Sequence, residues 1–311
     1  MNIVFMGTPD FAVPSLKMLI KEHNVLAVVT QPDKPKGRGK KLAFSPVKET
    51  ALENGIEVLQ PVKVKDGTFA EELKRFNADV FVVVAYGRIL TEEVLNLPKY
   101  GCINVHGSLL PKYRGAGPIQ WSIINGEKKT GVTTMFMEKG LDTGDMLIKT
   151  EIDIEPEDTY GTLEEKMSVV GAETLKETLE LLKEGKLKPQ KQDDEQSTYA
   201  PMINKETECI NWEDSAENIK NLIRGLNPEP GAYTVFNGDI LKIWRAEATD
   251  KQYGLKPGTI GETFKNGFVV ACGKGGLSVK ELQAKGGKKM DAGSYMRGHK
   301  VEAGMVFSDN K

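Results

Sequence analysis

One segment of the sequence places polar side chains at the end of a buried strand, close enough together to act jointly. Residues 101–111 read Gly-Cys-Ile-Asn-Val-His-Gly-Ser-Leu-Leu-Pro, which is typical of a strand that ends in a loop. Side chains alternate between the two faces of a strand, so Asn104 and His106 share a face and Val105 takes the other. A buried polar group without partners costs about 1–3 kcal/mol. The pair therefore either supports the loop through hydrogen bonds or takes part in chemistry.

The acidic turn Gly140–Asp145 is a second candidate, between strand-like residues 135–137 and 146–148. Asp and Gly are common in turns, so Asp142 alone is a weak indication of function. Beside His106 it has a further meaning, because a carboxylate can fix the tautomer of an imidazole and favour its charged form. The sequence therefore leaves two interpretations open for Asp142, a turn residue or a catalytic partner of His106.

The elements that must position these side chains alternate in type along the first 150 residues. Thr8 is expected to cap the first helix and Pro9 to start it. A longer helix is expected over 163–182. Apolar strands separated by helices predict βαβ units and a parallel sheet covered on both faces, with ligands bound at the carboxyl ends of the strands. The expected strands are 3–6, 25–29, 57–59, 80–84, 102–105 and 132–136.

The remainder of the chain has a different pattern. Residues 186–206 lose all apolar periodicity and are predicted to be a linker between a domain of residues 1–185 and one of residues 207–311. An amphipathic helix over 215–226 is followed by short strands, and Asn237-Gly238 favours a type I′ hairpin. About five short strands predict a small barrel or sandwich, of which the OB-fold is one possibility.

Composition excludes several classes of protein. The 311 residues carry a net charge of -2, with 39% hydrophobic and 28% charged residues, which indicates a soluble globular protein rather than a uniformly basic nucleic-acid coat. Three cysteines and three histidines are too few and too scattered for a disulfide framework or a zinc site. The longest apolar run, Val80–Ala85, is too short for a membrane helix, and the chain opens without a targeting leader, so a cytosolic location is expected.

Nucleotide-binding fingerprints are absent from the sequence. The first strand is followed by Gly7-Thr8-Pro9-Asp10-Phe11 rather than G-x-G-x-x-G, and no G-x-x-x-x-G-K-[ST] occurs. Pro9 also lacks an N–H that a pyrophosphate would need. A dinucleotide cofactor is therefore disfavoured.

The candidate residues together resemble the folate-dependent formyltransferase family. Its pattern is an Asn-x-His strand, a Ser-Leu-Leu-Pro loop and a later Asp in an Asp-x-Gly loop, which Asn104, His106, Ser108–Pro111 and Asp142 match. The resemblance covers essentially the whole chain and implies an α/β, Rossmann-like parallel-sheet formyltransferase domain followed by a small OB-like β-barrel. Further segments resemble the branch of the family that acts on methionyl-tRNA, namely residues 7–12, 31–34, 37–41, 84–87 and 227–228.

The activity that the resemblance implies is transfer of the formyl group of 10-formyltetrahydrofolate to the α-amino group of methionine on initiator tRNA. Asn104 would donate to the oxyanion of the tetrahedral intermediate, and His106 would donate a second hydrogen bond or a proton. Asp142 would orient His106 and help to take the proton that the amine loses. Folate is then a co-substrate, and neither a metal nor a covalent enzyme intermediate is required.

The resemblance also implies binding residues and a monomer whose partner is initiator methionyl-tRNA, without DNA or membrane. The basic loop Gln31–Lys41 would grip the acceptor stem, with Arg38 reaching deepest, although a solvated surface is the competing interpretation. A second candidate for a phosphate-facing patch lies on the C-terminal barrel, with ordinary surface lysines as the competing interpretation. Its residues are Lys285, Lys288, Lys289, Arg297, His299 and Lys300. Folate contacts are expected at Ala85, Tyr86, Gly87, Ile89, Leu90, Ser108, Leu109, Leu110 and Pro111, and tRNA contacts at Lys36, Arg38, Lys40 and Lys41.

Three other functions compete with this interpretation. A formyltransferase for a small amine, such as a nucleotide-linked sugar or glycinamide ribonucleotide, would share the three catalytic residues without needing the basic loop. A non-catalytic RNA-binding protein on the same scaffold would bind tRNA without regard to folate. An NAD-dependent oxidoreductase is disfavoured by the missing glycine fingerprint.

Overall fold

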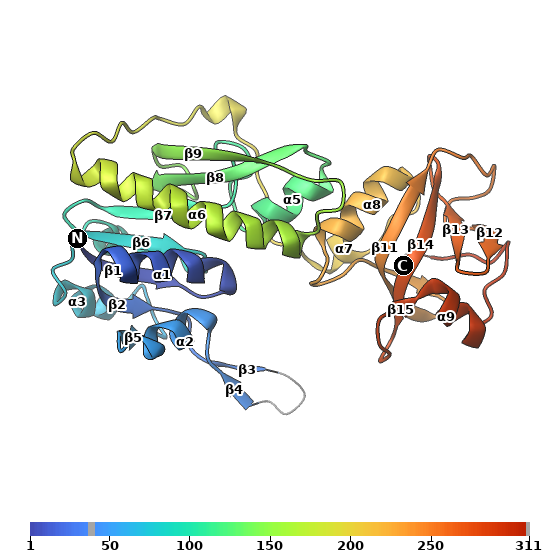
Figure 1. Ribbon diagram of the computed structural model, residues 1–311, viewed down its shortest axis with the longest axis horizontal. Coiled ribbons are helices and arrows are strands. Elements are labelled where there is room, and N and C mark those ends of the chain that lie inside the picture. Colours follow the sequence, from blue (N-terminus) through green and yellow to red (C-terminus); the bar gives the residue numbers. More distant parts are fainter. Residues whose placement is uncertain (37–40, 309–311) are drawn as a thin grey trace. The chain divides into compact units, whose positions relative to one another are not determined.

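The computed structural model describes residues 1–36 and 41–308 and consists of two compact units (Figure 1). The first comprises residues 1–115, 130–153 and 164–200, and the second comprises residues 116–129, 154–163 and the chain from 201 onward. Most of the segment predicted as a linker thus clusters with the first unit. The domain boundaries at residues 185 and 207 stay predictions.

The first unit is built on a mostly parallel sheet of Rossmann type. Its seven strands, as far as the described residues go, follow the order β5-β2-β1-β6-β7-β8-β9. The pairings among β5, β2, β1, β6 and β7 are parallel, and β6 is buried along its whole length, as the apolar run predicts. The strands are β1 (Asn2–Gly7), β2 (Asn24–Val29), β5 (Glu57–Leu59), β6 (Val80–Val84), β7 (Cys102–His106), β8 (Lys129–Phe136) and β9 (Met146–Asp153).

The sheet departs from the predicted parallel arrangement at β8, which runs antiparallel to β7. The chain between these strands does not cross back over the sheet as a βαβ helix does, because its helix α5 (Pro118–Ile124) clusters with the second unit. Strand β8 therefore begins at the end of the sheet where β7 finishes, and it runs in the opposite direction. This direction sets Thr133 opposite His106.

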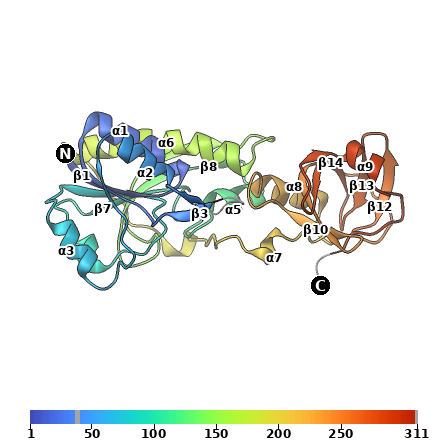
Figure 2. The ribbon, with the colours of Figure 1, turned by 90° about the horizontal axis from the view of Figure 1, so that it is seen from below.

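Helices cover both faces of the sheet, as predicted. Val4 and Phe81 belong to a core cluster with side chains from α3 (Thr68–Lys74) and α4 (Glu92–Leu95). The other helices lie over the opposite face, as both views of the ribbon show (Figure 1, Figure 2). They are α1 (Val13–Glu22), α2 (Pro46–Glu53) and α6 (Tyr160–Lys183). Within the described ranges, none of the helices has the length and the hydropathy that crossing a bilayer demands.

The first turn differs from the prediction that Thr8 caps and Pro9 starts the helix. A 3-10 turn (Asp10–Ala12) comes first, and α1 then begins at Val13. The Thr8 hydroxyl instead donates to the carbonyl of Tyr86, 3.2 Å away, and accepts from the backbone N–H of Gln31. A hydrogen bond across the sheet edge replaces the local cap, which sequence reasoning about neighbours does not reveal.

The second unit contains an antiparallel sheet that is consistent with a small barrel. The described strands follow the order β10-β11-β14-β13-β12, with β15 paired to β14. Asn237 (φ 52°) and Gly238 (φ 83°) are both left-handed, as the predicted type I′ turn between β10 and β11 requires. The strands are β10 (Tyr233–Phe236), β11 (Asp239–Thr249), β12 (Ile260–Phe264), β13 (Gly267–Ala271), β14 (Gly276–Ala284) and β15 (Met290–Asp291).

The predicted amphipathic helix is α8 (Ala216–Gly225), and it supplies part of this unit's core. Ser215 caps it by accepting a hydrogen bond from the N–H of Asn218. Ile219 and Ile223, one turn apart, are buried in the core cluster of the unit. Two further helices, α7 (Lys205–Glu208) and α9 (Ala292–Gly298), complete the unit.

The burial of the cysteines predicts selective thiol reactivity. Burial raises the pKa of Cys102 and of Cys272 to about 12, whereas Cys209 is partly exposed. A thiol with so high a pKa is almost entirely protonated at pH 8, and the thiolate is the reactive form. We expect a thiol reagent to label Cys209 in the native protein and all three cysteines after unfolding. Mass spectrometry of labelled peptides measures this, and fast native labelling of Cys102 would contradict the packing of β7.

Candidate functional site

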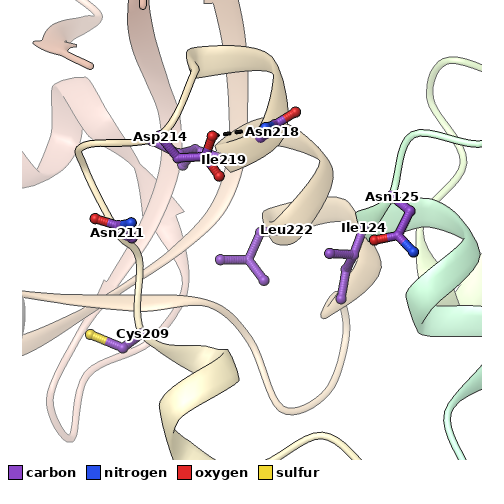
Figure 3. A pocket seen from close by; sticks show the side chains of 8 residues that line it. All are labelled: Ile124, Asn125, Cys209, Asn211, Asp214, Asn218, Ile219 and Leu222. Carbon is purple, nitrogen blue, oxygen red and sulfur yellow. Dashed lines mark hydrogen bonds between the residues drawn. The ribbon is translucent and has the colours of Figure 1, made fainter. Parts of the chain in front are cut away.

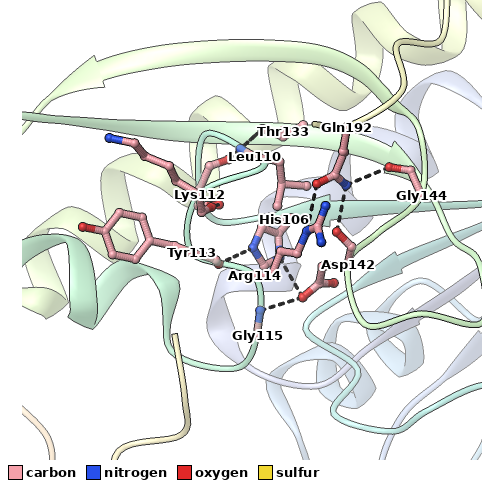
Figure 4. Close-up of polar contacts among 11 residues, drawn as sticks. His106, Leu110, Lys112, Tyr113, Arg114, Gly115, Thr133, Asp142, Gly144 and Gln192 are labelled. Atoms are coloured by element: carbon pink, nitrogen blue, oxygen red, sulfur yellow. Dashed lines mark hydrogen bonds and ion pairs between the residues drawn. The ribbon is translucent and has the colours of Figure 1, made fainter. Parts of the chain in front are cut away.

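The imidazole of His106 lies at the end of β7 between two partners of different kinds (Figure 4). Its Nε2 is 2.9 Å from the backbone carbonyl oxygen of Tyr113, and its Nδ1 is 3.7 Å from Oδ2 of Asp142. A carbonyl oxygen only accepts hydrogen bonds, so Nε2 carries the proton that it donates. The ring is 5% exposed, so its orientation depends on these contacts. Nδ1 is the nitrogen left for chemistry.

The carboxylate of Asp142 is held in its own turn. Its Oδ2 accepts a hydrogen bond of 2.9 Å from the N–H of Gly115, and its backbone adopts a φ of 52°. The distance of 3.7 Å to His106 fits an ion pair but is too long for a hydrogen bond. The hydrogen bond that selects the tautomer of His106 is therefore made by Tyr113, and the orienting role that the resemblance implies for Asp142 stays a prediction.

Asn104 is 9% exposed on β7, where it pairs in register with Val83 of β6 and Met135 of β8. Its side-chain amide forms no hydrogen bond with any residue that the structure describes. The pleat puts this amide on the same face of the strand as His106. A nearly buried amide without a protein partner is a donor that a ligand can use.

The Ser108–Pro111 loop after β7 is stabilised by hydrogen bonds within the protein. The hydroxyl of Thr133 donates to the carbonyl of Ser108 at 2.7 Å and accepts from the N–H of Leu110 at 3.1 Å. The Ser108 hydroxyl donates to the carbonyl of Lys112. The side chain of Leu110 is fully buried in a small apolar cluster. Of the folate residues predicted here, Leu109 and Pro111 keep partly exposed side chains.

The loop after β6 contains the other predicted folate residues. Gln31 donates from Nε2 to the carbonyls of Tyr86 (3.0 Å) and Gly87 (3.3 Å), which fixes the backbone. Tyr86 and Leu90 are buried, whereas Ile89 is 67% exposed. Burial raises the pKa of Tyr86 to about 12, and its hydroxyl has no partner among the described residues. Ala85 (φ 48°) and Gly87 (φ 78°) are left-handed. Folate contacts at these positions stay predictions.

The predicted tRNA loop is described only at its base. Arg38 and Lys40 lie outside the described residues. Lys36 ends β3 (Lys34–Lys36) and pairs in antiparallel register with Lys41, which begins β4 (Lys41–Ala43).

A hydrogen-bonded cluster fixes the base of this loop. Lys48 donates to Asp33 at 2.6 Å, and Gln60 donates to the same carboxylate at 2.8 Å. These two hydrogen bonds hold the pKa of Asp33 below its usual value. The cluster places the hairpin at the end of β2.

A separate cavity of about 470 Å³ belongs to the second unit (Figure 3). Helix α8 forms much of its lining, and Asn218 donates to Asp214 across 2.7 Å. None of the predicted site residues lines it. The lining residues are Ile124, Asn125, Cys209, Asn211, Asp214, Asn218, Ile219 and Leu222.

Two family models match the chain. Residues 1–179 match "Formyl transferase" and residues 202–300 match "Formyl transferase, C-terminal domain". A methionyl-tRNA formyltransferase of Caldanaerobacter subterraneus subsp. tengcongensis is 57% identical over 309 residues, which is 99% of this chain and 100% of that protein. One of Acetivibrio thermocellus is 53% identical, with 99% of each chain covered. The chain belongs to the methionyl-tRNA formyltransferase family.

A solved structure shows the same fold at lower identity. The N-formyltransferase from Helicobacter canadensis, solved with folinic acid and dTDP-3-aminofucose, is 24% identical, with a TM-score of 0.67 over 93% of this chain and 99% of that chain. The fold predicted from the sequence is thereby confirmed for this formyltransferase. Across the part of the chain that the structure covers, no three His, Cys, Asp or Glu side chains gather as metal ligands.

Sequence reasoning missed three residues that hold the formyltransferase site together. Tyr113 supplies the carbonyl that binds His106, Gln192 binds the Asp142 turn, and Arg114 binds Gln192. Gln192 lies in the segment predicted as a linker, where the loss of apolar periodicity gave no signal of burial. It is 6% exposed, and its hydrogen bonds reach Asp142, Gly144 and Arg114, which are all distant along the chain.

Thr133 offers a test of the loop's internal hydrogen bonds. Thr133→Val keeps the volume but leaves the carbonyl of Ser108 and the N–H of Leu110 without their partner, so we expect a loss of about 1–3 kcal/mol in the free energy of unfolding. Denaturant titration measures the change. The control is Thr263→Val at an exposed strand position, which should be nearly neutral. Equal effects of the two substitutions would show that Thr133 does not support the loop.

Proposed function

We propose that this formyltransferase transfers the formyl group of 10-formyltetrahydrofolate to the α-amino group of methionyl initiator tRNA. The observation that carries the proposal is the pairing of His106 with Asp142, on the strand face that also bears Asn104, whose amide has no partner among the described residues. Relatives at 57% and 53% identity are named methionyl-tRNA formyltransferases, which supports this acceptor over a small amine.

Each group has a role in the transfer. The amine nitrogen attacks the formyl carbon, and the carbonyl electrons move onto the oxygen to form an oxyanion. The amide of Asn104 donates to that oxyanion. Nδ1 of His106, when protonated, donates a second hydrogen bond, since Nε2 is already engaged by Tyr113.

Asp142 has two roles in this mechanism, one electrostatic and one as a proton acceptor. Its carboxylate stabilises the imidazolium of His106 and accepts the proton that the attacking amine loses. Collapse of the intermediate breaks the bond to the folate nitrogen, and the same proton passes to that leaving nitrogen. The products are the formylated amine and tetrahydrofolate, without a covalent enzyme intermediate.

The binding surfaces belong to the proposal as well. The loops after β6 and β7 supply backbone donors and acceptors for the pterin, and the basic loop binds acceptor-stem phosphates. The protein acts as a monomer in the cytoplasm, where the charged initiator tRNA is made.

The decisive experiment is transfer of labelled formyl from 10-formyltetrahydrofolate to methionyl initiator tRNA. Parallel reactions contain uncharged tRNA, a dTDP-linked amino sugar and glycinamide ribonucleotide. We expect label on the charged tRNA alone. Preferential label on a small amine would replace the proposed substrate, and tRNA binding without any transfer would favour a non-catalytic RNA-binding protein.

Substitution of the predicted catalytic pair should affect turnover more than binding. We expect Asn104→Ala and His106→Ala each to lower kcat by roughly 10²–10⁴, because their hydrogen bonds strengthen mainly in the transition state. If both serve one oxyanion, the double variant loses less than the product of the two single losses. Single-turnover kinetics with measured tRNA affinity tests this. A single variant with wild-type chemistry would remove that residue from the mechanism.

A substitution in the basic loop distinguishes a tRNA-binding loop from a solvated surface. We expect Arg38→Ala to weaken tRNA binding and to flatten its dependence on salt, on the scale of about 0.9 in slope for each phosphate that the loop no longer neutralises. Arg38→Lys should recover only part of the affinity, because a guanidinium binds phosphate through two hydrogen bonds. The exposed Lys17 of α1 provides the control Lys17→Ala. Identical salt slopes for Arg38→Ala and wild type would show that the loop does not contact the phosphates of the tRNA.

A further inference from the structure

Residues 190–200, here named the return segment, pass back along the catalytic loops after α6. Gln190 exchanges two backbone hydrogen bonds with Met146, of 2.8 and 2.9 Å. Further along, the carbonyl of Thr198 accepts from the N–H of Arg114, and its hydroxyl accepts from the N–H of Tyr113. The return segment thus binds the same loop whose carbonyl holds His106.

Gln192 is the member of the return segment that reaches the Asp142 turn (Figure 4). Its Nε2 donates to the carbonyl of Asp142 and to the carbonyl of Gly144, both at 2.8 Å. The two amide hydrogens therefore bridge the turn on either side of Thr143. The side chain is 6% exposed, so water does not compete for these carbonyls.

Arg114 determines which way the amide of Gln192 faces. Its Nε donates to Oε1 of Gln192 at 3.0 Å, and its Nη2 donates to Asp194 at 2.7 Å. A guanidinium has donors only, so the oxygen of Gln192 must face Arg114 and the NH₂ group must face the turn. A charged donor on the oxygen also polarises the amide and strengthens the two bonds that it donates.

The Asp142 turn needs such support. Its φ of 52° is left-handed, a conformation that is strained for a residue with a Cβ and that persists only where surrounding contacts impose it. The carboxylate of Asp142 accepts a hydrogen bond from the N–H of Gly115, while its backbone carbonyl accepts one from Gln192. Release of the backbone would let the carboxylate move away from His106.

We propose that Gln192 is a positioning residue for Asp142, oriented by Arg114 and acting through the backbone of the turn. This inference rests on the proposed function, in which Asp142 accepts the proton of the amine. Among the described residues, the hydrogen bonds of Gln192 reach Asp142, Gly144 and Arg114 but not His106. Its effect on the reaction therefore passes entirely through Asp142.

Two substitutions isolate the donated hydrogen bonds. Gln192→Met keeps the length of the side chain and removes both donors, whereas Gln192→Glu keeps an acceptor for Arg114 and also removes the donors. We expect either change to lower kcat on the order of 10- to 10²-fold, the scale of a misplaced catalytic group, with the KM of each substrate changed by less than about twofold. The control is Gln196→Met, because among the described residues the side chain of Gln196 bonds to Asp193 alone, at the surface of the same segment.

A double-mutant cycle with Asp142→Asn shows whether the effect passes through Asp142. We expect Gln192→Met to cause little further loss of kcat in that background, since the carboxylate is already absent. The same fractional loss in both backgrounds, or wild-type kcat for both Gln192 variants, would overturn the proposal. If one variant fails to fold, the other completes the cycle.

A readout without turnover separates this inference from the proposed function. We expect the amide hydrogen of Gly115 to exchange faster in Gln192→Met than in Gln196→Met, because its acceptor is Oδ2 of Asp142. Unchanged exchange would overturn the positioning role. Should the wild type formylate another amine instead of methionyl-tRNA, the proposed substrate fails and the same cycle is measured with that amine.

Discussion

His106 faces two acceptors, a backbone carbonyl and a carboxylate, and the elements of the first unit hold both in place. Nε2 requires an acceptor and finds the carbonyl of Tyr113, while Nδ1 faces the carboxylate of Asp142. The acceptor lies seven residues beyond the ring, so the chain must fold back on itself after β7. Tyr113 adopts a φ of 61° in doing so. A partly strained loop is therefore part of the site.

The sheet places the site at the end of β7, and the antiparallel strand β8 stabilises the loop that follows β7. Because β8 runs against β7, Thr133 lies opposite His106 and its hydroxyl satisfies two backbone groups of the Ser108–Leu110 loop. A parallel β8 would present its residues in a different register. The direction of one strand thus decides how the loop after the catalytic strand is held.

Gln31 connects the base of the basic loop to the loop after β6. Its side chain binds the carbonyls of Tyr86 and Gly87, while its own backbone carbonyl accepts from Gln60. Gln60 also binds Asp33 at the start of the basic hairpin. The loop after β6 and the base of the basic loop are therefore joined by hydrogen bonds at one edge of the sheet.

Local signals in the sequence were sufficient for most elements of the fold. Buried apolar runs such as 80–84 predict strands because a parallel strand is covered on both faces, and the Asn237-Gly238 turn is predicted because both residues tolerate a positive φ. Asn104 and His106 were predicted as a pair because the period of a strand is local. Their grouping with Asp142 came from a family pattern, and the structure places Asp142 beside His106.

Contacts between residues that are distant along the chain could be identified only from the tertiary structure. The direction of β8, the hydrogen bond between Thr8 and Tyr86 and the burial of Gln192 join positions far apart along the chain. No periodicity or turn propensity encodes such pairs, because each partner is an ordinary polar residue in its own neighbourhood. The residues and their local conformations can thus be read from the sequence, whereas the partners that orient them are decided only when the chain closes on itself.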